Sequence, residues 1–135
     1  RVRSSAASDV YKRQPLGFHD YNCLQMNAFA VVSDSGTLPE ESSFFLSVGK
    51  PFPAVSIRTS TERPEALDAG CFVLAGIEAE ALIQAVEMAV RMQEEGTLGT
   101  PVADYAAENV SMKVARIIQS YTGIVNRMVW RKDGT

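Results

Sequence analysis

Short, nearly continuous apolar runs alternate with longer amphipathic stripes along most of this chain, and this alternation restricts the fold more than any other feature. The runs lie at residues 28–32, 54–57 and 71–74. Continuous apolar strands are typical of parallel sheets that helices cover on both faces. Alternation of strands with helices is typical of βα units. The sequence therefore predicts an α/β fold built on a parallel sheet with flanking helices.

Helical periodicity fills the segments between and after these runs. Helices are expected at residues 20–27, at about 37–48, in a short stretch after Pro64, at 78–95, and from about 108 onward. Pro64 suits a first helical turn, whereas Gly49, Gly70 and Gly96 are placed to end helices. The helices at about 37–48, after Pro64 and at 78–95 then each have a predicted start or stop that agrees with the strand assignment.

The two longest helices carry apolar stripes, which we interpret as core. In the first, the stripe is Ala79, Leu82, Ile83, Val86, Ala89 and Val90. In the last helix, it is Val110, Val114, Ile117, Ile118, Tyr121 and Val125. The length of the last stripe indicates that this helix packs on more than the one sheet.

The first fourteen residues differ in composition from the rest of the chain. Residues 1–14 have a net charge of +3, whereas residues 15–135 carry 9 basic and 15 acidic side chains, a net charge of −6. The absence of an apolar h-region argues against a secretory signal. Asp9-Val10-Tyr11-Lys12-Arg13-Gln14 resembles the translation of a transposon end used to prepare sequencing libraries. We expect residues 1–14 to be non-native or a natural disordered arm, and the first option implies that upstream native sequence is missing.

Composition and charge exclude several classes of function. With 46% apolar and 21% charged residues, the chain is typical of one soluble globular domain. Its longest apolar stretches, such as 71–77, are far shorter than the roughly 20 residues that span a bilayer. A net charge of −3 without a basic stripe argues against nucleic-acid binding. Cys23 and Cys71 lack disulfide-framework or zinc-site spacing, which favours reduced thiols in the cytoplasm.

A polar turn containing glycine follows the first predicted strand. Ser33-Asp34-Ser35-Gly36-Thr37 lies at the carboxyl end of that strand, where open α/β sheets bind ligands. Gly36 lets a ligand approach the backbone, and free N–H groups at the helix start attract an anion such as a diphosphate. The alternative is an ordinary N-cap turn with no ligand.

Glu41 is the acidic residue best placed to extend this site. It lies four residues after Thr37 on the same side of the predicted helix. Its carboxylate is close enough to the turn to accept hydrogen bonds from vicinal hydroxyls of a sugar, whereas Glu40 is expected to point elsewhere.

The loop after the second strand supplies two cations, Arg58 and Arg63. Arg63 directly precedes Pro64 and is placed to grip phosphate oxygens bidentately. A local ion pair of Arg63 with Glu62 or Glu65 is the alternative.

His19 is the only histidine and precedes Asp20 and Tyr21 at another predicted corner. A lone histidine is more often structural than catalytic, and no serine in this chain forms a triad with it. The sequence also lacks the glycine-rich fingerprints of dinucleotide and ATP sites. The residues alone therefore assign no catalytic group.

Three motifs in fixed order resemble the non-hydrolysing UDP-N-acetylglucosamine 2-epimerase family. They are Ser33-Asp34-Ser35-Gly36-Thr37-Leu38-Pro39-Glu40-Glu41, Gly49-Lys50-Pro51 and Thr61-Glu62-Arg63-Pro64-Glu65-Ala66, and the resemblance covers residues 15–132. His19-Asp20-Tyr21-Asn22 and residues 120–126 resemble the branch that makes UDP-N-acetyl-L-fucosamine for capsule and O-antigen polysaccharides.

This resemblance implies a glycosyltransferase-B-type fold, with UDP-sugar bound between two Rossmann-like domains. Residues 15–135 would be the C-terminal UDP-binding domain, partnered by the N-terminal domain of the same enzyme, in a cytoplasmic protein whose relatives commonly form dimers. The implied UDP contacts are Ser35, Gly36 and Thr37 to the diphosphate, Glu41 to the ribose, Arg63 to the anion, and the corner from His19 to Leu24 to the uracil. The sequence departs from the family where Thr37 replaces a second glycine, and where His19 and Leu24 replace Gln and Phe.

The implied reaction is C2 epimerisation by elimination and re-addition of UDP, here of UDP-N-acetyl-L-pneumosamine to UDP-N-acetyl-L-fucosamine, without a nicotinamide or other cofactor. The acid/base carboxylates would lie in the other domain, so we expect this chain alone to be inactive. Two alternatives are the nucleotide-sugar domain of a glycosyltransferase of the same fold and a binding module that acts alone.

Overall fold

The computed structural model describes residues 15–132, so the expectations for residues 1–14 lie outside the described residues. The elements in chain order are α1 (Phe18–Asn27), β1 (Val31–Ser33), α2 (Leu38–Ser47), β2 (Ala54–Ser56), α3 (Pro64–Asp68), β3 (Val73–Leu74), α4 (Ala79–Glu94), the 3-10 helix η2 (Ala103–Tyr105) and α5 (Val110–Met128). The strands form one parallel sheet in the order β1-β2-β3. The predicted α/β fold with a parallel sheet is confirmed.

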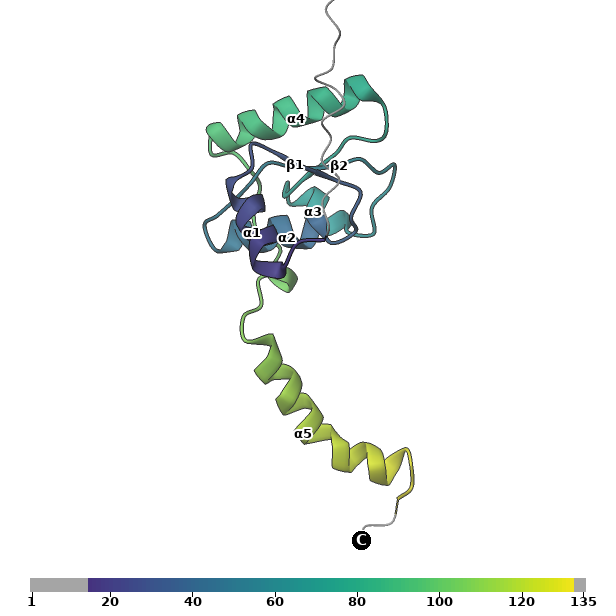
Figure 1. The fold of residues 1–135 in the computed structure, drawn as a ribbon. Helices are drawn as coiled ribbons and strands as arrows, with labels where there is room; N and C mark the ends of the chain where they lie inside the picture. The colour runs from purple at the N-terminus through teal and green to yellow at the C-terminus, as the bar shows by residue number, and fades with distance from the viewer. Residues whose placement is uncertain (1–14, 133–135) are drawn as a thin grey trace, which may run out of the picture.

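Strand β2 lies at the centre of the sheet, and all three of its residues are buried. Successive side chains of a strand point to opposite faces. Ala54 packs with residues of α2 and α3, whereas Val55 packs with Ala85 and Ala89 of α4. Figure 1 shows α4 on one side of the sheet and α2 and α3 on the other. Helices on both faces explain why β2 is apolar without alternation, whereas Val32 in the edge strand β1 is 44% exposed.

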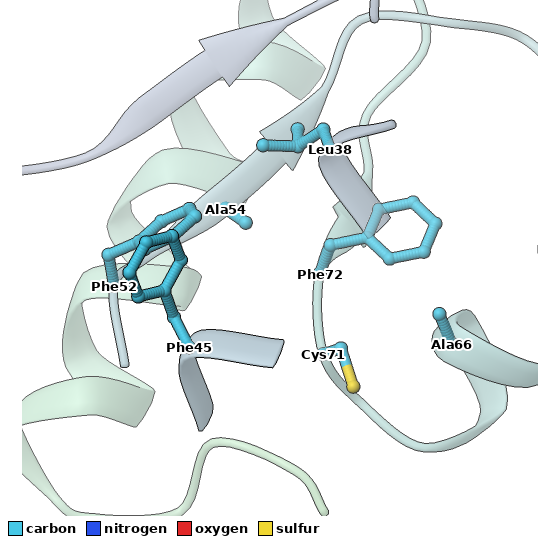
Figure 2. Packing of buried hydrophobic residues seen from close by; sticks show 7 residues of the cluster. All are labelled: Leu38, Phe45, Phe52, Ala54, Ala66, Cys71 and Phe72. Carbon is cyan, nitrogen blue, oxygen red and sulfur yellow. The ribbon is translucent and has the colours of Figure 1, made fainter. Parts of the chain in front are cut away.

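The larger core lies between the sheet and helices α2 and α3 (Figure 2). Its buried members are Leu38, Phe45, Phe52, Ala54, Ala66, Cys71 and Phe72. The rings of Phe45 and Phe52 meet edge to face, with centroids 5.6 Å apart. Leu38 is fully buried and directly follows the turn at residues 34–37. Burial of Leu38 therefore fixes where that turn lies.

The ends of the elements follow local backbone chemistry. Gly49 and Gly70, which follow α2 and α3, have φ angles of 71° and 75°, a region that L side chains rarely adopt. Strand β1 begins three residues later than the apolar run at 28–32, because the Ala28 N–H still donates to the Gln25 carbonyl at the end of α1.

The interpretation of the apolar stripes as core is wrong for helix α5, and in α4 it fails for Ala79 and Ile83, which are exposed. No residue of α5 is buried, and Ile117 and Ile118 are 58% and 60% exposed. Figure 1 shows α5 extending away from the sheet. Periodicity identifies an apolar face, but it does not say what covers that face. Within residues 15–132, no helix is both long and apolar enough to cross a bilayer.

Gly99 packs against the chain that follows α3, and this contact yields a prediction. A Cβ at Gly99 would lie 1.7 Å from the Ala69 carbonyl oxygen, whereas a Cβ at Gly123 in α5 would have no atom within 4 Å. We predict that Gly99→Ala lowers the free energy of unfolding by about 2 kcal/mol or more, as measured by urea denaturation. The matched control Gly123→Ala should leave stability unchanged or raise it by up to about 1 kcal/mol. Equal stability of the two variants would contradict this packing.

Candidate functional site

The two polar loops singled out in the sequence lie at one edge of the sheet. The turn at 34–37 follows β1, and the loop at 57–63 follows β2. These strands are parallel neighbours, and the Ile57 N–H donates to the Ser33 carbonyl at 3.1 Å. The carboxyl ends of parallel strands are where open α/β sheets bind ligands. The structure therefore brings the glycine turn and the arginine loop into one candidate site.

Hydroxyl groups organise the turn. Ser33 Oγ accepts a hydrogen bond from the Ser35 N–H at 3.0 Å. Ser35 Oγ accepts one from the Thr37 N–H at 3.3 Å and lies 2.9 Å from Thr37 Oγ1. Thr37 occupies the N-cap position of α2 but makes no side-chain capping bond. The Thr37 side chain therefore does not cap α2 in the ordinary way.

Glu41 is the centre of a hydrogen-bonded cluster beside this turn. Thr37 Oγ1 donates to its Oε1 at 2.7 Å. Gln25 Nε2 and the Tyr21 hydroxyl donate to its Oε2 at 2.6 Å and 3.3 Å. Hydrogen bonds to an ionised carboxylate are strong and fix its orientation. The prediction that Glu41 lies next to Thr37 is confirmed.

Sequence reasoning missed Tyr21 and Gln25 as partners of Glu41. They lie four residues apart on α1, and Gln25 Nε2 is 3.0 Å from the Tyr21 hydroxyl. Burial, followed by the charge and hydrogen bond of Glu41, raises the pKa of Tyr21 above its ordinary value. Tyr21 therefore stays protonated and donates to the carboxylate. The i, i+4 spacing of Tyr21 and Gln25 predicts that the two side chains lie on one face of α1, but it does not predict that Glu41 is their partner.

The residues of the corner from His19 to Leu24 do not all lie together. His19 lines a cavity of about 580 Å³ between α1, α2 and η2, together with Asn22, Glu41 and Phe44. Leu24 is 59% exposed. The expected contact of His19 and Leu24 with a base stays a prediction.

Arg58 lies directly against the glycine turn. Its Nη1 is 3.3 Å from the position that a Cβ on Gly36 would take, so the missing side chain of Gly36 leaves room for the guanidinium. Both Nη atoms of Arg58 donate to the Glu62 carboxylate, each at 3.0 Å. This hydrogen bonding and the charge of Arg58 lower the pKa of Glu62. Glu62 Oε2 is 3.8 Å from the same Cβ position, so the turn faces the Arg58 guanidinium together with the carboxylate that holds it.

Arg63 has different partners from those that the sequence suggested. Its Nε donates to Glu40 Oε1 at 2.5 Å, across 23 residues of sequence, and its Nη1 donates to the main-chain carbonyl of Glu62 at 3.1 Å. The hydrogen bond and charge of Glu40 raise the pKa of Arg63. Glu40 is therefore the ion-pair partner of Arg63 rather than a free acid. The contact of Arg63 with an anion stays a prediction.

This arrangement suits a phosphorylated, hydroxyl-bearing ligand. The turn, the start of α2 and Arg58 supply hydrogen-bond donors and positive charge for phosphate oxygens, and Glu41 supplies an acceptor for hydroxyls. Within residues 15–132, no three His, Cys, Asp or Glu side chains are grouped so that they could hold a metal ion.

Comparison with known proteins agrees with the motifs. Residues 2–119 match the family model described as UDP-N-acetylglucosamine 2-epimerase. That range includes residues 2–14, and our expectation for that segment stays a prediction. The UDP-N-acetylglucosamine 2-epimerase of Methanococcus maripaludis is 39% identical over 74 residues, covering 55% of this chain and 19% of the relative. The probable UDP-N-acetylglucosamine 2-epimerase of Ralstonia solanacearum is 30% identical over 118 residues, covering 84% of this chain and 29% of the relative.

A solved structure, the UDP-GlcNAc 2-epimerase from Methanocaldococcus jannaschii, matches with a TM-score of 0.54 and 26% identity, covering 80% of this chain and 27% of that chain. The likeness confirms the Rossmann-like α/β fold. The chain spans only 19% to 29% of the length of the relatives described above. Since the family model matches most of its residues, the chain belongs to the UDP-N-acetylglucosamine 2-epimerase family.

Proposed function

We propose that this chain is the UDP-binding C-terminal region of a nucleotide-sugar 2-epimerase. The observation that carries this proposal is the convergence of the glycine turn, Arg58 and Glu41 at the carboxyl edge of the sheet. Each group matches one part of UDP, and the family membership makes a UDP-sugar the natural ligand.

The diphosphate is bound by Ser35, Gly36 and Thr37 together with a guanidinium. Arg58 is the better placed of the two arginines, because its Nη1 already lies beside Gly36. A guanidinium has five N–H donors, and the pair with Glu62 uses two of them. The other three are available to phosphate oxygens. Arg63, which the family resemblance implies as the anion contact, donates its Nε–H to Glu40.

The nucleoside is bound at the corner formed by α1. Glu41 accepts hydrogen bonds from the ribose hydroxyls, since its orientation is already set by Thr37 and Gln25. The uracil lies against the corner from His19 to Leu24. Tyr21, which is 37% exposed and adjoins Glu41, offers an aromatic face for stacking in the same corner.

The reaction is elimination of UDP across C1 and C2 of the sugar, followed by re-addition after C2 has been reprotonated from the other face. Charge develops on the leaving diphosphate and must be stabilised at a preorganised site. The glycine turn and Arg58 perform this role and retain UDP until it adds back. The acid and base carboxylates belong to the rest of the protein, so this chain binds UDP without turning a substrate over.

The specific substrate is UDP-N-acetyl-L-pneumosamine, converted to UDP-N-acetyl-L-fucosamine in the cytoplasm for surface polysaccharide synthesis. This finer assignment is supported by the stretches His19-Asp20-Tyr21-Asn22 and 120–126, which resemble that branch of the family. A nucleotide-sugar domain of a glycosyltransferase remains the alternative, because the same fold and the same UDP contacts would serve it.

The N-terminal domain of the enzyme is the partner that we assign to α5. Its apolar stripe is exposed, with Val114, Ile117 and Tyr121 at 47%, 58% and 57%, and most of the length of the family relatives lies outside this chain. The basic residues from α5 to the end of the described chain are Lys113, Arg116, Arg127, Arg131 and Lys132, with no acidic residue among residues 110–132. The surface that receives α5 should therefore be an apolar groove with acidic margins.

We predict that Arg58→Ala weakens UDP binding by this chain at least tenfold, because charge-assisted hydrogen bonds of about 1.5–3 kcal/mol are lost. Titration calorimetry measures the effect. Lys113→Ala, which removes the same charge from the distant helix α5, is the matched control and should leave the affinity unchanged. An Arg58→Ala variant that binds UDP as tightly as the parent chain would contradict the site.

The reaction type is tested in the complete enzyme that contains this chain. We predict that incubation with UDP-N-acetyl-L-pneumosamine in deuterated water places deuterium at C2 of the sugar, as followed by proton NMR. Loss of the C2 proton signal is expected because reprotonation draws on solvent. Transfer of the sugar to an acceptor without deuterium at C2 would favour the glycosyltransferase alternative.

A further inference from the structure

We propose that Glu40, Arg63 and Glu62 are positioning residues that hold Arg58 against the glycine turn through a chain of hydrogen bonds. We call this chain of contacts the Arg63 relay. The inference rests on the proposed UDP site, and it assigns Arg63 a role behind the guanidinium that meets the ligand.

The relay begins on α2 and returns to the turn that precedes α2. Glu40 in the first turn of α2 accepts a hydrogen bond from Arg63 Nε. Arg63 Nη1 donates to the main-chain carbonyl of Glu62, whose carboxylate holds both Nη atoms of Arg58. Arg58 then lies beside Gly36, four residues before Glu40. The hydrogen bond from Arg63 to Glu40 thus joins the arginine loop to α2, and Arg58 packs beside the turn that precedes α2.

Side chains must make this connection because the backbone does not. Main-chain pairing of β1 and β2 reaches the bond from the Ile57 N–H to the Ser33 carbonyl. Among the described residues, no main-chain hydrogen bond joins residues 58–62 to the turn at 34–37. The distance between Arg58 and the turn is therefore set by the side chains of the relay.

The guanidinium of Arg63 suits this role through its shape as well as its charge. It donates in two directions at once, to a carboxylate on another element and to a carbonyl in its own loop. A lysine carries the same charge but lacks this planar fork. The side chains of Arg63 and Glu40 are about one-third exposed, at 37% and 34%, so the pair is partly shielded from water.

Removal of the Glu40 charge distinguishes the relay from simple electrostatics. UDP is an anion, so loss of a nearby negative charge should by itself strengthen its binding. The same holds if Arg63 contacts UDP directly, since Glu40→Gln would release Arg63 for the ligand. The relay instead predicts that Glu40→Gln weakens UDP binding, because Arg58 would no longer be held at the turn.

The experiment compares Glu40→Gln with Glu65→Gln in the chain, using UDP as the ligand and calorimetry as the measurement. Glu65 is the matched control, because it is an acid of the same motif that bonds to the Tyr105 hydroxyl and lies outside the relay. We expect Glu40→Gln to weaken UDP binding about three- to tenfold, and Glu65→Gln to leave it within about twofold. Arg63→Lys keeps the positive charge at position 63 but should weaken UDP binding to a similar extent as Glu40→Gln, because lysine lacks the planar fork. Tighter or unchanged binding by Glu40→Gln would overturn the relay.

A second measurement does not depend on UDP. Arg58 lowers the pKa of Glu62, and carbon NMR of the Glu62 carboxyl follows its titration. The relay predicts that Glu40→Gln raises the pKa of Glu62, because Arg58 pairs with it less firmly. Direct electrostatics predicts a fall, because one negative charge has been removed. An unchanged or lower pKa of Glu62 in the Glu40→Gln variant would overturn the relay. Absence of UDP binding by the parent chain would overturn the proposed function, and this titration would still test the relay.

Discussion

The parallel pairing of β1 with β2 is the interaction on which the candidate site depends. It places the ends of both strands at one edge of the sheet, so that the glycine turn and the arginine loop meet. Burial of Leu38 then anchors the turn from its other side, because this residue starts α2 and is fully enclosed in the core. A polar site with exposed side chains is thereby held by an apolar core (Figure 2).

Local patterns were sufficient to predict the fold, because short continuous apolar runs indicate buried strands and a spacing of three to four residues indicates helices. The three strands and the placement of Glu41 beside Thr37 followed from such spacing. The pairing of Glu40 with Arg63 could not follow from it, since the two residues are separated by 23 positions. The partners of Glu41 on α1 were missed for the same reason. Helix α5 shows the converse limit, since its apolar stripe is clear in the sequence but none of its residues is buried in the described chain.

Arg58 and Arg63 lie in the same loop but have different partners. Arg63 is part of the more distinctive motif, and sequence reasoning therefore favoured it as the anion contact. The geometry favours Arg58, because the absence of a side chain at Gly36 makes room for its guanidinium. We therefore propose that Arg63 positions Arg58, and that Arg58 contacts the ligand.

The central claim is that the carboxyl edge of β1 and β2 binds UDP. The most direct measurement is a proton–nitrogen NMR titration of the chain with UDP. The account predicts that the largest shifts occur at the amides of Ser35, Gly36 and Thr37 and at the Nε–H of Arg58, with little change along α5. Shifts confined to other parts of the chain, or no shifts at saturating UDP, would contradict it.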